Sequence, residues 1–408
     1  MPLVYWFRVV NMQIPGDSGS ISYELDRKYA FPTLGFDSEL VARAFDLERL
    51  RGNFGLGTTP GSILSELHDL FQMMMSVISA RIEGNRTTIF EALTESTRER
   101  RGSISPAESW HEIRNLLRAM EFIDLRDQAE PLSHVFVRQL HELAVAELVR
   151  EGDPTPGSYR STDVAILQAE HRPPRHIAVQ SEMSDLLDFA NQDVNTSLQM
   201  VHVAMAHHRF LWIHPFRNGN GRVSRLLSYA MLRKHGFVSP AGYRTVNPVA
   251  VFGNDREGYY SSLSRADDLS NEGTIEWCTF FVRGIHEDME RLTQLQDVDF
   301  LMRQLLEPAI GRMVASGGAS RAEGQALRIA LQREVVKAGD LAEALPGTPS
   351  QRSVAIRSMV EKGLLRHASQ GPRFYRAAIA TEPFGPFVVR QLDRLGFLPR
   401  ILKDDNGA

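Results

Sequence analysis

The chain has 408 residues, and 46 Lys and Arg stand against 50 Asp and Glu, so its net charge is −4 at neutral pH. This length can bury a large core and predicts two or three domains, and 43% hydrophobic and 24% charged residues are ordinary values for globular proteins. The charge argues against nucleic-acid binding over the whole surface, although it leaves a local patch open. The single cysteine, Cys278, excludes an intramolecular disulfide and a thiolate metal cluster.

The N-terminal segment shows no targeting signal. Residues 1–14 lack a charged start followed by an apolar run, and no stretch approaches the roughly 18 apolar residues of a membrane span. We therefore expect a soluble, cytoplasmic protein without membrane contact. Residues 1–61 mix short apolar runs with turns and are expected to pack on the core. The glycine cluster at 55–61 lacks the Lys-Ser/Thr of a phosphate-binding P-loop, which indicates a loop.

A helical core is predicted over residues 62–292, and one of its first helices ends at Gly84, the expected left-handed cap. Glu83 then falls in the last turn, where a carboxylate meets the negative end of the helix dipole and gains by contacting a cation. The apolar residues that mark this helix are Leu67, Leu70, Phe71, Met74 and Ile78.

Residues 157–191 contain short extended runs around a turn, at 158–160, 164–166, 173–174 and 177–179. A buried helix is predicted next, from Thr196 to Ile213, because this stretch has neither Pro nor Gly. Pro215 should end that helix and push His214 toward an extended conformation. His214 is thus expected at a helix exit, where it can face a cleft. The adjacent His207 and His208 cannot share a helix face, which argues against a metal pair.

A second helix is predicted after the glycines, with Gly219 to Arg222 at its N-terminus. Free backbone N–H groups and the positive dipole end make such a terminus an anion site. Arg222 and Arg225 are three residues apart and lie on one face of the first turn. Two cations at the positive helix end oppose the dipole, so a bound anion or an acidic partner would explain them.

Residues 293–408 show a different pattern, which begins as helix to about Val336. A short helix at 338–345, a helix from Thr348 to Lys362, and a hairpin over 364–379 together resemble a winged-helix domain. Arg352, Arg357 and Lys362 lie on or near its second helix. We expect either DNA or a protein partner for 338–379.

Two motifs resemble the Fic-domain protein adenylyltransferases. Residues 214–225, His-Pro-Phe-Arg-Asn-Gly-Asn-Gly-Arg-Val-Ser-Arg, are similar to the signature HxFx(D/E)GNGRxxR and depart from it at Asn218. Residues 79–85, Ser-Ala-Arg-Ile-Glu-Gly-Asn, resemble the inhibitory (S/T)xxxE(G/N) motif of one Fic class. With looser similarity from His111 to Phe281, the resemblance covers about half of the chain. It implies a mainly α, Fic-type core with a short β-hairpin flap, followed by the winged-helix-like domain.

The resemblance implies a role for each residue of the signature. His214 would be the general base that takes the proton from a target hydroxyl as it attacks the α-phosphorus of ATP. Phe216 would anchor the loop in the core, and Glu83 would inhibit by pairing with the second signature arginine. The expected nucleotide-binding residues are Gly219, Asn220 and Gly221 around the α- and β-phosphates, Arg222 at the β-phosphate, Arg225 at the γ-phosphate and Tyr260 near the adenine.

Asn218 stands where the family places an acidic ligand for Mg²⁺ or Mn²⁺. An Asn oxygen can coordinate a metal but brings no charge, so we expect weaker metal affinity, slower transfer, an altered nucleotide or metal preference, or loss of transfer. The flap at 157–191 would dock an extended protein target.

These features predict an autoinhibited enzyme that moves AMP from ATP to a Ser, Thr or Tyr hydroxyl of a protein, which could be the chain itself. Removal of AMP from a modified protein stays open as an alternative, as does a nucleotide-binding regulator in which the winged helix acts on DNA or protein. A homodimer is also open.

Overall fold

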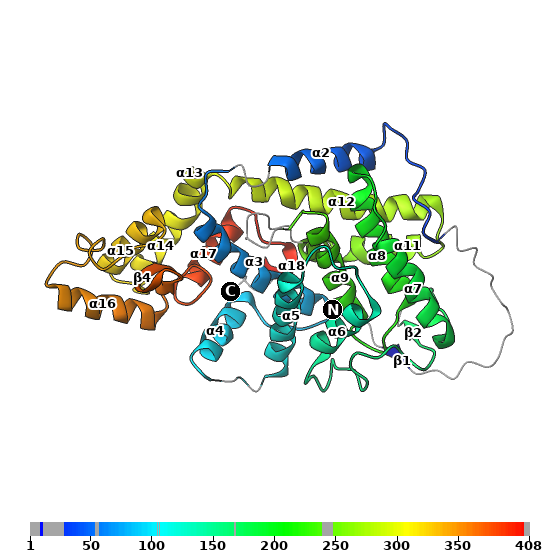
Figure 1. Cartoon of the computed structure of the whole chain (residues 1–408), viewed down its shortest axis with the longest axis horizontal. Coiled ribbons are helices and arrows are strands. Elements are labelled where there is room, and N and C mark those ends of the chain that lie inside the picture. Colours follow the sequence, from blue (N-terminus) through cyan, green and yellow to red (C-terminus); the bar gives the residue numbers. More distant parts are fainter. Residues whose placement is uncertain are drawn as a thin grey trace.

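The computed structural model is mainly helical, and its two small sheets have two strands each (Figure 1). The structure describes residues 9–10, 28–53, 57–103, 105, 107–166, 169–238 and 248–403. Within these residues, no helix combines the length and the apolar character that crossing a membrane requires.

The centre of the molecule is α8 (Gln199–Ile213), which is buried along nearly its whole length. It packs on α9 (Asn220–Lys234), α12 (Asn271–Gln294) and α7 (Val179–Ala190), and the predicted buried helix is therefore confirmed. The elements around this centre are α2 (Glu39–Asn53), α4 (Ile89–Arg100), α5 (Glu108–Leu125), α6 (His134–Val145), η1 (His176–Ala178), η2 (Thr196–Leu198), α10 (Pro248–Asn254) and α11 (Arg256–Ala266).

Two adjacent histidines of α8 satisfy buried polar groups. His207 lies 2.8 Å from the Ser228 hydroxyl through Nδ1, and its Nε2 lies 3.1 Å from the Tyr259 hydroxyl. His208 turns the other way, to Asp267, with Nε2 3.1 Å from a carboxylate oxygen. Burial lowers the pKa of both histidines well below the usual range. Both are therefore neutral core residues, and the prediction that they form no metal pair is consistent with these contacts.

The long helix α3 (Gly61–Ile82) crosses between the catalytic half and the C-terminal part (Figure 1). Glu83 is its C-cap, and Gly84 follows with φ of 100°, the left-handed cap that the sequence predicts. At its other end, Gly57 lies so close to Gln296 that a Cβ would come within 2.4 Å of the Gln296 carbonyl oxygen. That approach explains a glycine in the loop before α3.

Among the described residues of 157–191, no two strands pair with each other as the expected hairpin requires. β2 (Ala165–Ile166) pairs antiparallel with β1 (Val9–Val10), so its partner comes from the N-terminal segment. The run at 177–179, predicted as extended, is helical at the junction of η1 and α7. This segment is helical because Val179, Met183 and Leu186 have helical spacing, so that a helix buries all three on one face.

The C-terminal part continues α13 (Val298–Phe300) through the π-helical η3 (Leu301–Leu306) into α14 (Glu307–Ala315) and α15 (Arg321–Arg333). Val336 forms a bridge to Tyr375, so a third strand position extends the sheet of β3 (Leu365–Ala368) and β4 (Gly371–Ala377). The helix expected at 338–345 is a run of turns. Thr348 caps α16 (Pro349–Lys362) through a capping box with Gln351, as its sequence predicts.

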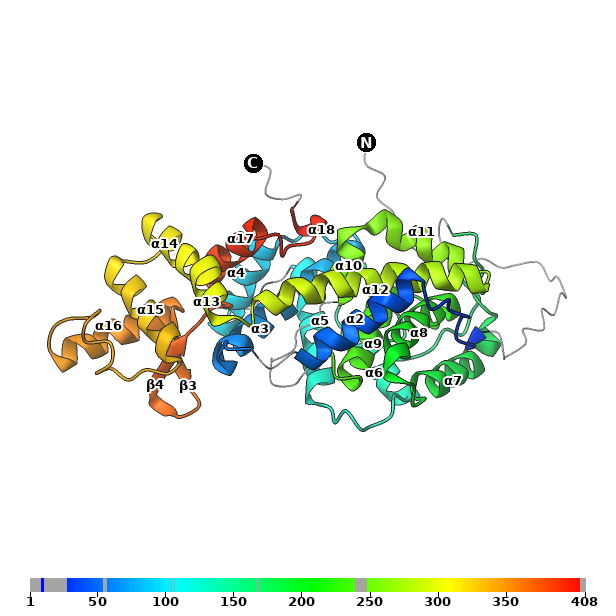
Figure 2. The same ribbon diagram turned by 90° about the horizontal axis from the view of Figure 1, so that it is seen from above.

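A buried carboxylate on α3 connects this part to the core. Glu66 is 3% exposed, forms ion pairs with Arg366 of β3 and Arg376 of β4, and accepts a hydrogen bond of 3.0 Å from the Ile379 amide. The chain then returns to the core in α17 (Gly385–Arg394) and α18 (Arg400–Lys403), and α18 packs on α3 and α10 (Figure 2). The hairpin is thus held on the same helix that ends at Glu83.

Candidate active site

His214 lies directly after α8, as predicted, but its backbone is left-handed, with φ of 51° and ψ of 61°. The predicted extended conformation is therefore wrong. A proline disfavours only the right-handed helical region before it, and the left-handed cap lets the His214 amide donate to the Phe210 carbonyl at 3.0 Å. The His214 carbonyl accepts a hydrogen bond of 2.8 Å from Arg160 Nε. These bonds hold a conformation that costs energy for a residue with a side chain.

The His214 ring is poised as a neutral base. Its Nδ1 lies 3.4 Å from the Leu211 carbonyl oxygen. A carbonyl can only accept, so Nδ1 carries the proton and Nε2 is the proton acceptor. Burial, followed by the charge of Arg160, lowers the pKa of His214 to about 3.

Helix α9 begins at Asn220, immediately after Gly219, whose φ is 75°. The first-turn amides of a helix have no partner within it, and this terminus lies a few residues from His214. Gly221 faces the tip of α3, and a Cβ there would come within 2.3 Å of Glu83 Oε1. Glycine is thus required at 221 by the close approach of the Glu83 carboxylate.

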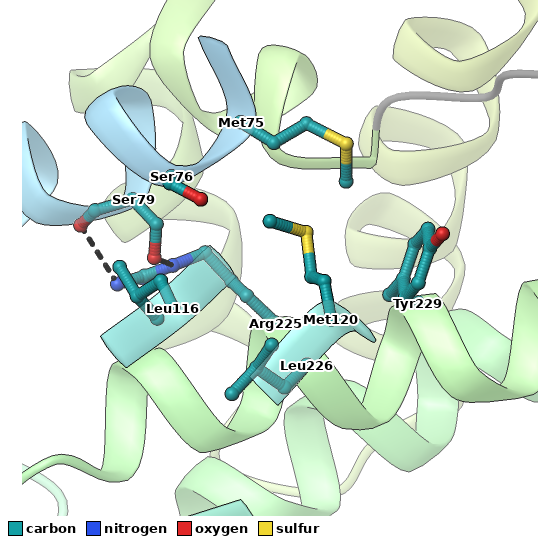
Figure 3. A pocket seen from close by; sticks show the side chains of 8 residues that line it. All are labelled: Met75, Ser76, Ser79, Leu116, Met120, Arg225, Leu226 and Tyr229. Atoms are coloured by element: carbon teal, nitrogen blue, oxygen red, sulfur yellow. Dashed lines mark hydrogen bonds between the residues drawn. The ribbon is translucent and has the colours of Figure 1, made fainter. Parts of the chain in front are cut away.

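Arg225 is held by two residues of the predicted inhibitory motif, Glu83 and Ser79, and Figure 3 shows its contacts with Ser79. Its Nη2 donates to Glu83 Oε1 at 2.5 Å, and its Nε donates to the Ser79 hydroxyl at 2.9 Å. Ser79 and Glu83 are four residues apart, so they lie on one face of α3. Burial disfavours the charge of Arg225, but Glu83 together with Tyr259 and Tyr260 raises its pKa. The guanidinium borders a cavity of about 10 Å³ whose other walls include Met75, Met120 and Leu226.

Arg222 also faces a carboxylate. Its Nη1 lies 3.3 Å from Glu112 Oε1 on α5, and its Nη2 donates to the Glu151 carbonyl at 2.6 Å. Glu112 is 3% exposed, and burial raises its pKa. The other Glu112 oxygen accepts from Asn85 Nδ2 at 2.9 Å. Glu112 therefore connects the turn after Glu83 to the first signature arginine.

The signature loop is fixed from within. Phe216 is fully buried, and its ring stacks on His141 with centroids 3.8 Å apart. Asn220 closes a ring of two hydrogen bonds with the Phe216 backbone, accepting from its amide at 2.9 Å and donating to its carbonyl at 2.8 Å. The Asn220 side chain thus fastens the loop, and only its backbone amide is left to meet an anion.

Asn218 has a structural role that Asp could not fill. Its Nδ2 donates to the Gly152 carbonyl at 3.1 Å, and its Oδ1 accepts from the Gly219 amide at 2.7 Å. A carboxylate has no proton to give to Gly152. The nearest carboxylate, Asp153, accepts from the Asn218 amide at 3.1 Å and from Thr155.

This donor set does not fit a metal held by the protein. In the described part of the chain, no group of three His, Cys, Asp or Glu could hold an ion. A metal bound together with a nucleotide would find one neutral oxygen at position 218, Asn218 Oδ1, which already accepts a hydrogen bond from the Gly219 amide.

Tyr260 lies near the same ion pair. Burial raises its pKa to about 12, and the next largest effect is the negative charge of Glu83. The Arg256 guanidinium lies 5.7 Å from its ring centroid. Its contact with adenine stays a prediction.

Three residues of the site were not found from the sequence: Glu112, Arg160 and Asp153. Glu112 shares a helix face with the buried Leu116 and Met120, and a Glu on an apolar face is a signal that could have revealed it. Arg160 and Asp153 lie in irregular segments, where no periodicity indicates burial.

The comparisons with known proteins agree with this geometry. Residues 131–232 match the model of the Fic/DOC family. Relatives named Protein adenylyltransferase Fic include one from Nematostella vectensis, 28% identical over 196 residues, which are 46% of this chain and 42% of the relative. Another, from Drosophila willistoni, is 30% identical over 222 residues, 53% of this chain and 40% of the relative. The chain thus spans about two fifths of the length of these relatives.

Solved structures share the fold. A Fic family protein from Desulfovibrio desulfuricans G20 has a TM-score of 0.51 at 19% identity and covers 85% of this chain and 98% of its own. A Fic-domain signalling protein from Bacteroides thetaiotaomicron VPI-5482 has a TM-score of 0.50 at 18% identity, with coverage of 62% and 96%.

A buried histidine lies at a helix exit and is followed by a glycine turn and by a helix N-terminus with two arginines. A helix N-terminus of this kind is a type of site that can hold an anion. The matches specify the class further. Residues 131–232 are similar to the Fic/DOC family, and the fold of the chain is that of the solved Fic family protein.

Proposed function

We propose that the chain is a protein adenylyltransferase that moves AMP from ATP to a protein hydroxyl, and that Glu83 holds it in an inhibited state. The observation that carries the proposal is the place of His214 beside the N-terminus of α9, which also bears Arg222 and Arg225. A base and a cationic helix terminus are what transfer at a phosphorus centre requires. The relatives named as adenylyltransferases support the same chemistry.

In the proposed reaction, the target oxygen attacks the α-phosphorus of ATP. The new bond joins that oxygen to the α-phosphorus, and the bond from the α-phosphorus to the bridging oxygen breaks, which releases pyrophosphate. The hydroxyl proton passes to His214 Nε2. The low pKa of His214 leaves its ring neutral, with Nε2 unprotonated. A bound polyphosphate, being negative, would raise this pKa and strengthen the base.

The proposed inhibition follows from the contacts of Arg225. Its guanidinium is engaged by Glu83 and Ser79, so a γ-phosphate can bind it only by displacing the carboxylate. Glu83 lies at a helix end beside Gly84, where small changes in backbone angles can move it. Withdrawal of Glu83 also removes the carboxylate that lies against Gly221.

The test uses Glu83→Gly protein with ATP labelled at either the α or the γ position. Transfer of AMP retains the α label on protein and releases the γ label in pyrophosphate. Retention of the γ label would identify phosphoryl transfer and refute the proposal. Glu95→Gly, which removes a half-buried carboxylate of α4 that lies outside the site, is the control.

A protein target would dock as an extended segment beside β2. The antiparallel pairing of Ala165 with Val10 is consistent with an edge that accepts such a segment. Main-chain pairing would align a hydroxyl with His214 without requiring a strict target sequence.

One observation favours a second candidate, a nucleotide-binding regulator with weakened chemistry. The Asn218 side chain forms hydrogen bonds within the protein through both Nδ2 and Oδ1, so it is a weak candidate for a metal ligand. A bound divalent cation would supply charge neutralisation at the phosphates, which Arg222 and Arg225 supply here in part. The regulator is supported if Glu83→Gly binds ATP and transfers no label. Release of AMP from a pre-modified target would instead support the other alternative, removal of AMP by an attacking water.

A further inference from the structure

The charge of the chain is unevenly distributed. Residues 321–379 contain ten Lys and Arg and five Asp and Glu, a net charge of +5. The remaining residues contain 36 Lys and Arg and 45 Asp and Glu, a net charge of −9. A compact positive segment on an otherwise negative protein is the electrostatic pattern of a local nucleic-acid contact.

The same residues have the order of elements found in winged-helix domains: helix α15, a strand position at Val336, a turn, helix α16, and the hairpin of β3 and β4. We propose that this module binds duplex DNA, with the exposed face of α16 in the major groove and the hairpin against the backbone.

The exposed face of α16 has the side chains that base reading needs. Ser350, Ser353, Val354 and Arg357 are exposed on its first two turns, and the first acidic residue of the helix is Glu361 in its last turn. Arginine pairs with guanine, serine bonds to several bases, and an apolar side chain contacts the thymine methyl. Val354 is 61% exposed.

The hairpin separates its cations between two faces. Arg366 and Arg376 are register partners and both pair with Glu66, so they hold the module on the core. Arg373 is three residues from Arg376, on the opposite side of β4, and it is exposed. Lys337 follows the bridge residue Val336, and its ammonium lies 4.8 Å from the Phe374 ring centroid. Arg373 is thus placed for a phosphate contact.

The position of the module leaves room for a duplex. In both views α16 lies at one end of the molecule, far from α8 and α9 (Figures 1 and 2). A major groove about 12 Å wide admits a helix, and the Fic site would remain open to ATP and target.

The test is fluorescence anisotropy of the full chain with a labelled random-sequence duplex of about 30 base pairs, a length that exceeds typical contact sites. The titrations run in salt from about 50 to 200 mM. The variants are Arg357→Ala/Arg373→Ala and, as a control with the same charge change, Arg98→Ala/Arg100→Ala on α4. Neither pair belongs to the Fic site. Circular dichroism confirms that both variants fold.

Binding that weakens with salt is expected, with a loss of tenfold or more and a salt slope reduced by about 1 to 2 in Arg357→Ala/Arg373→Ala, while the control matches wild type. Three results would overturn the proposal: no duplex binding at the lowest salt, an equal loss in both variants, or binding to anionic vesicles or an acidic peptide without binding to duplex. AMP transfer is read separately, so failure here leaves the proposed function intact.

Discussion

Replacing Glu83 with Gln should reveal the γ-phosphate site. The Arg225 side chain is 2% exposed and the Glu83 side chain 14%, so the pair is nearly buried. Removing one partner of a buried pair costs about 3–5 kcal/mol. Because Ser79 keeps two hydrogen bonds to Arg225 and Gln keeps a neutral acceptor, we expect Glu83→Gln to lower the free energy of unfolding by about 2 kcal/mol.

That free energy is what ATP must overcome to reach Arg225 in the wild type. Since each 1.4 kcal/mol is a factor of ten, the variant should bind ATP up to about 30-fold more tightly than the wild type. ADP lacks the γ-phosphate, so its affinity should change little. Isothermal titration with both nucleotides measures the ATP-to-ADP affinity ratio directly.

The matched control is Glu95→Gln, which breaks an exposed pair with Arg98 on α4 and should cost at most about 0.5 kcal/mol of stability. An ATP-to-ADP ratio that stays the same in Glu83→Gln and wild type would refute the reasoning. So would a stability loss no larger than that of Glu95→Gln.

Three further outcomes follow from the structure. Asn218→Asp loses the hydrogen bond to the Gly152 carbonyl, so stability should fall by about 1 kcal/mol while transfer gains Mg²⁺ dependence, both measurable by denaturant unfolding and a metal titration. His214 and His235 have pKa values lowered to about 3 by burial. Below about pH 6.5 the unfolded chain takes up protons on these histidines and the folded chain does not, so the free energy of unfolding should fall by up to about 1.4 kcal/mol per pH unit for each histidine as the pH drops toward about 3. A free energy of unfolding that does not change over this pH range would contradict the expectation. Glu66→Gln leaves two arginines without their carboxylate and should cost about 2–4 kcal/mol, seen as earlier proteolysis of the C-terminal part.

The parts of the site that are contiguous in sequence could be predicted. The helix before His214, the glycine turn and the next helix follow from local rules on Pro, Gly and apolar spacing, and the structure has all three. Thr348 as a helix cap is local in the same sense. The Glu83–Arg225 pair joins residues 142 apart, and only the resemblance to Fic motifs indicated it.

The predictions that were wrong or missed concern residues whose structure depends on contacts with distant parts of the chain. β2 pairs with residues near the N-terminus, and two-residue strands carry no alternation that could specify a partner. The His214 backbone follows from hydrogen bonds with Arg160 and Phe210, which no local rule contains. The contact of Glu112 with Arg222 required knowing that α5 packs on α9.

The most direct test of the central claim is incorporation of α-labelled ATP by wild type, Glu83→Gly and Glu83→Gly/His214→Ala, with Mg²⁺ or Mn²⁺. The account predicts strong labelling of protein by Glu83→Gly, weak labelling by wild type, and loss of at least about a hundredfold in the double variant, as expected when a general base is removed. Equal labelling of wild type and Glu83→Gly would contradict inhibition by Glu83. Labelling that persists without His214 would contradict the proposed base.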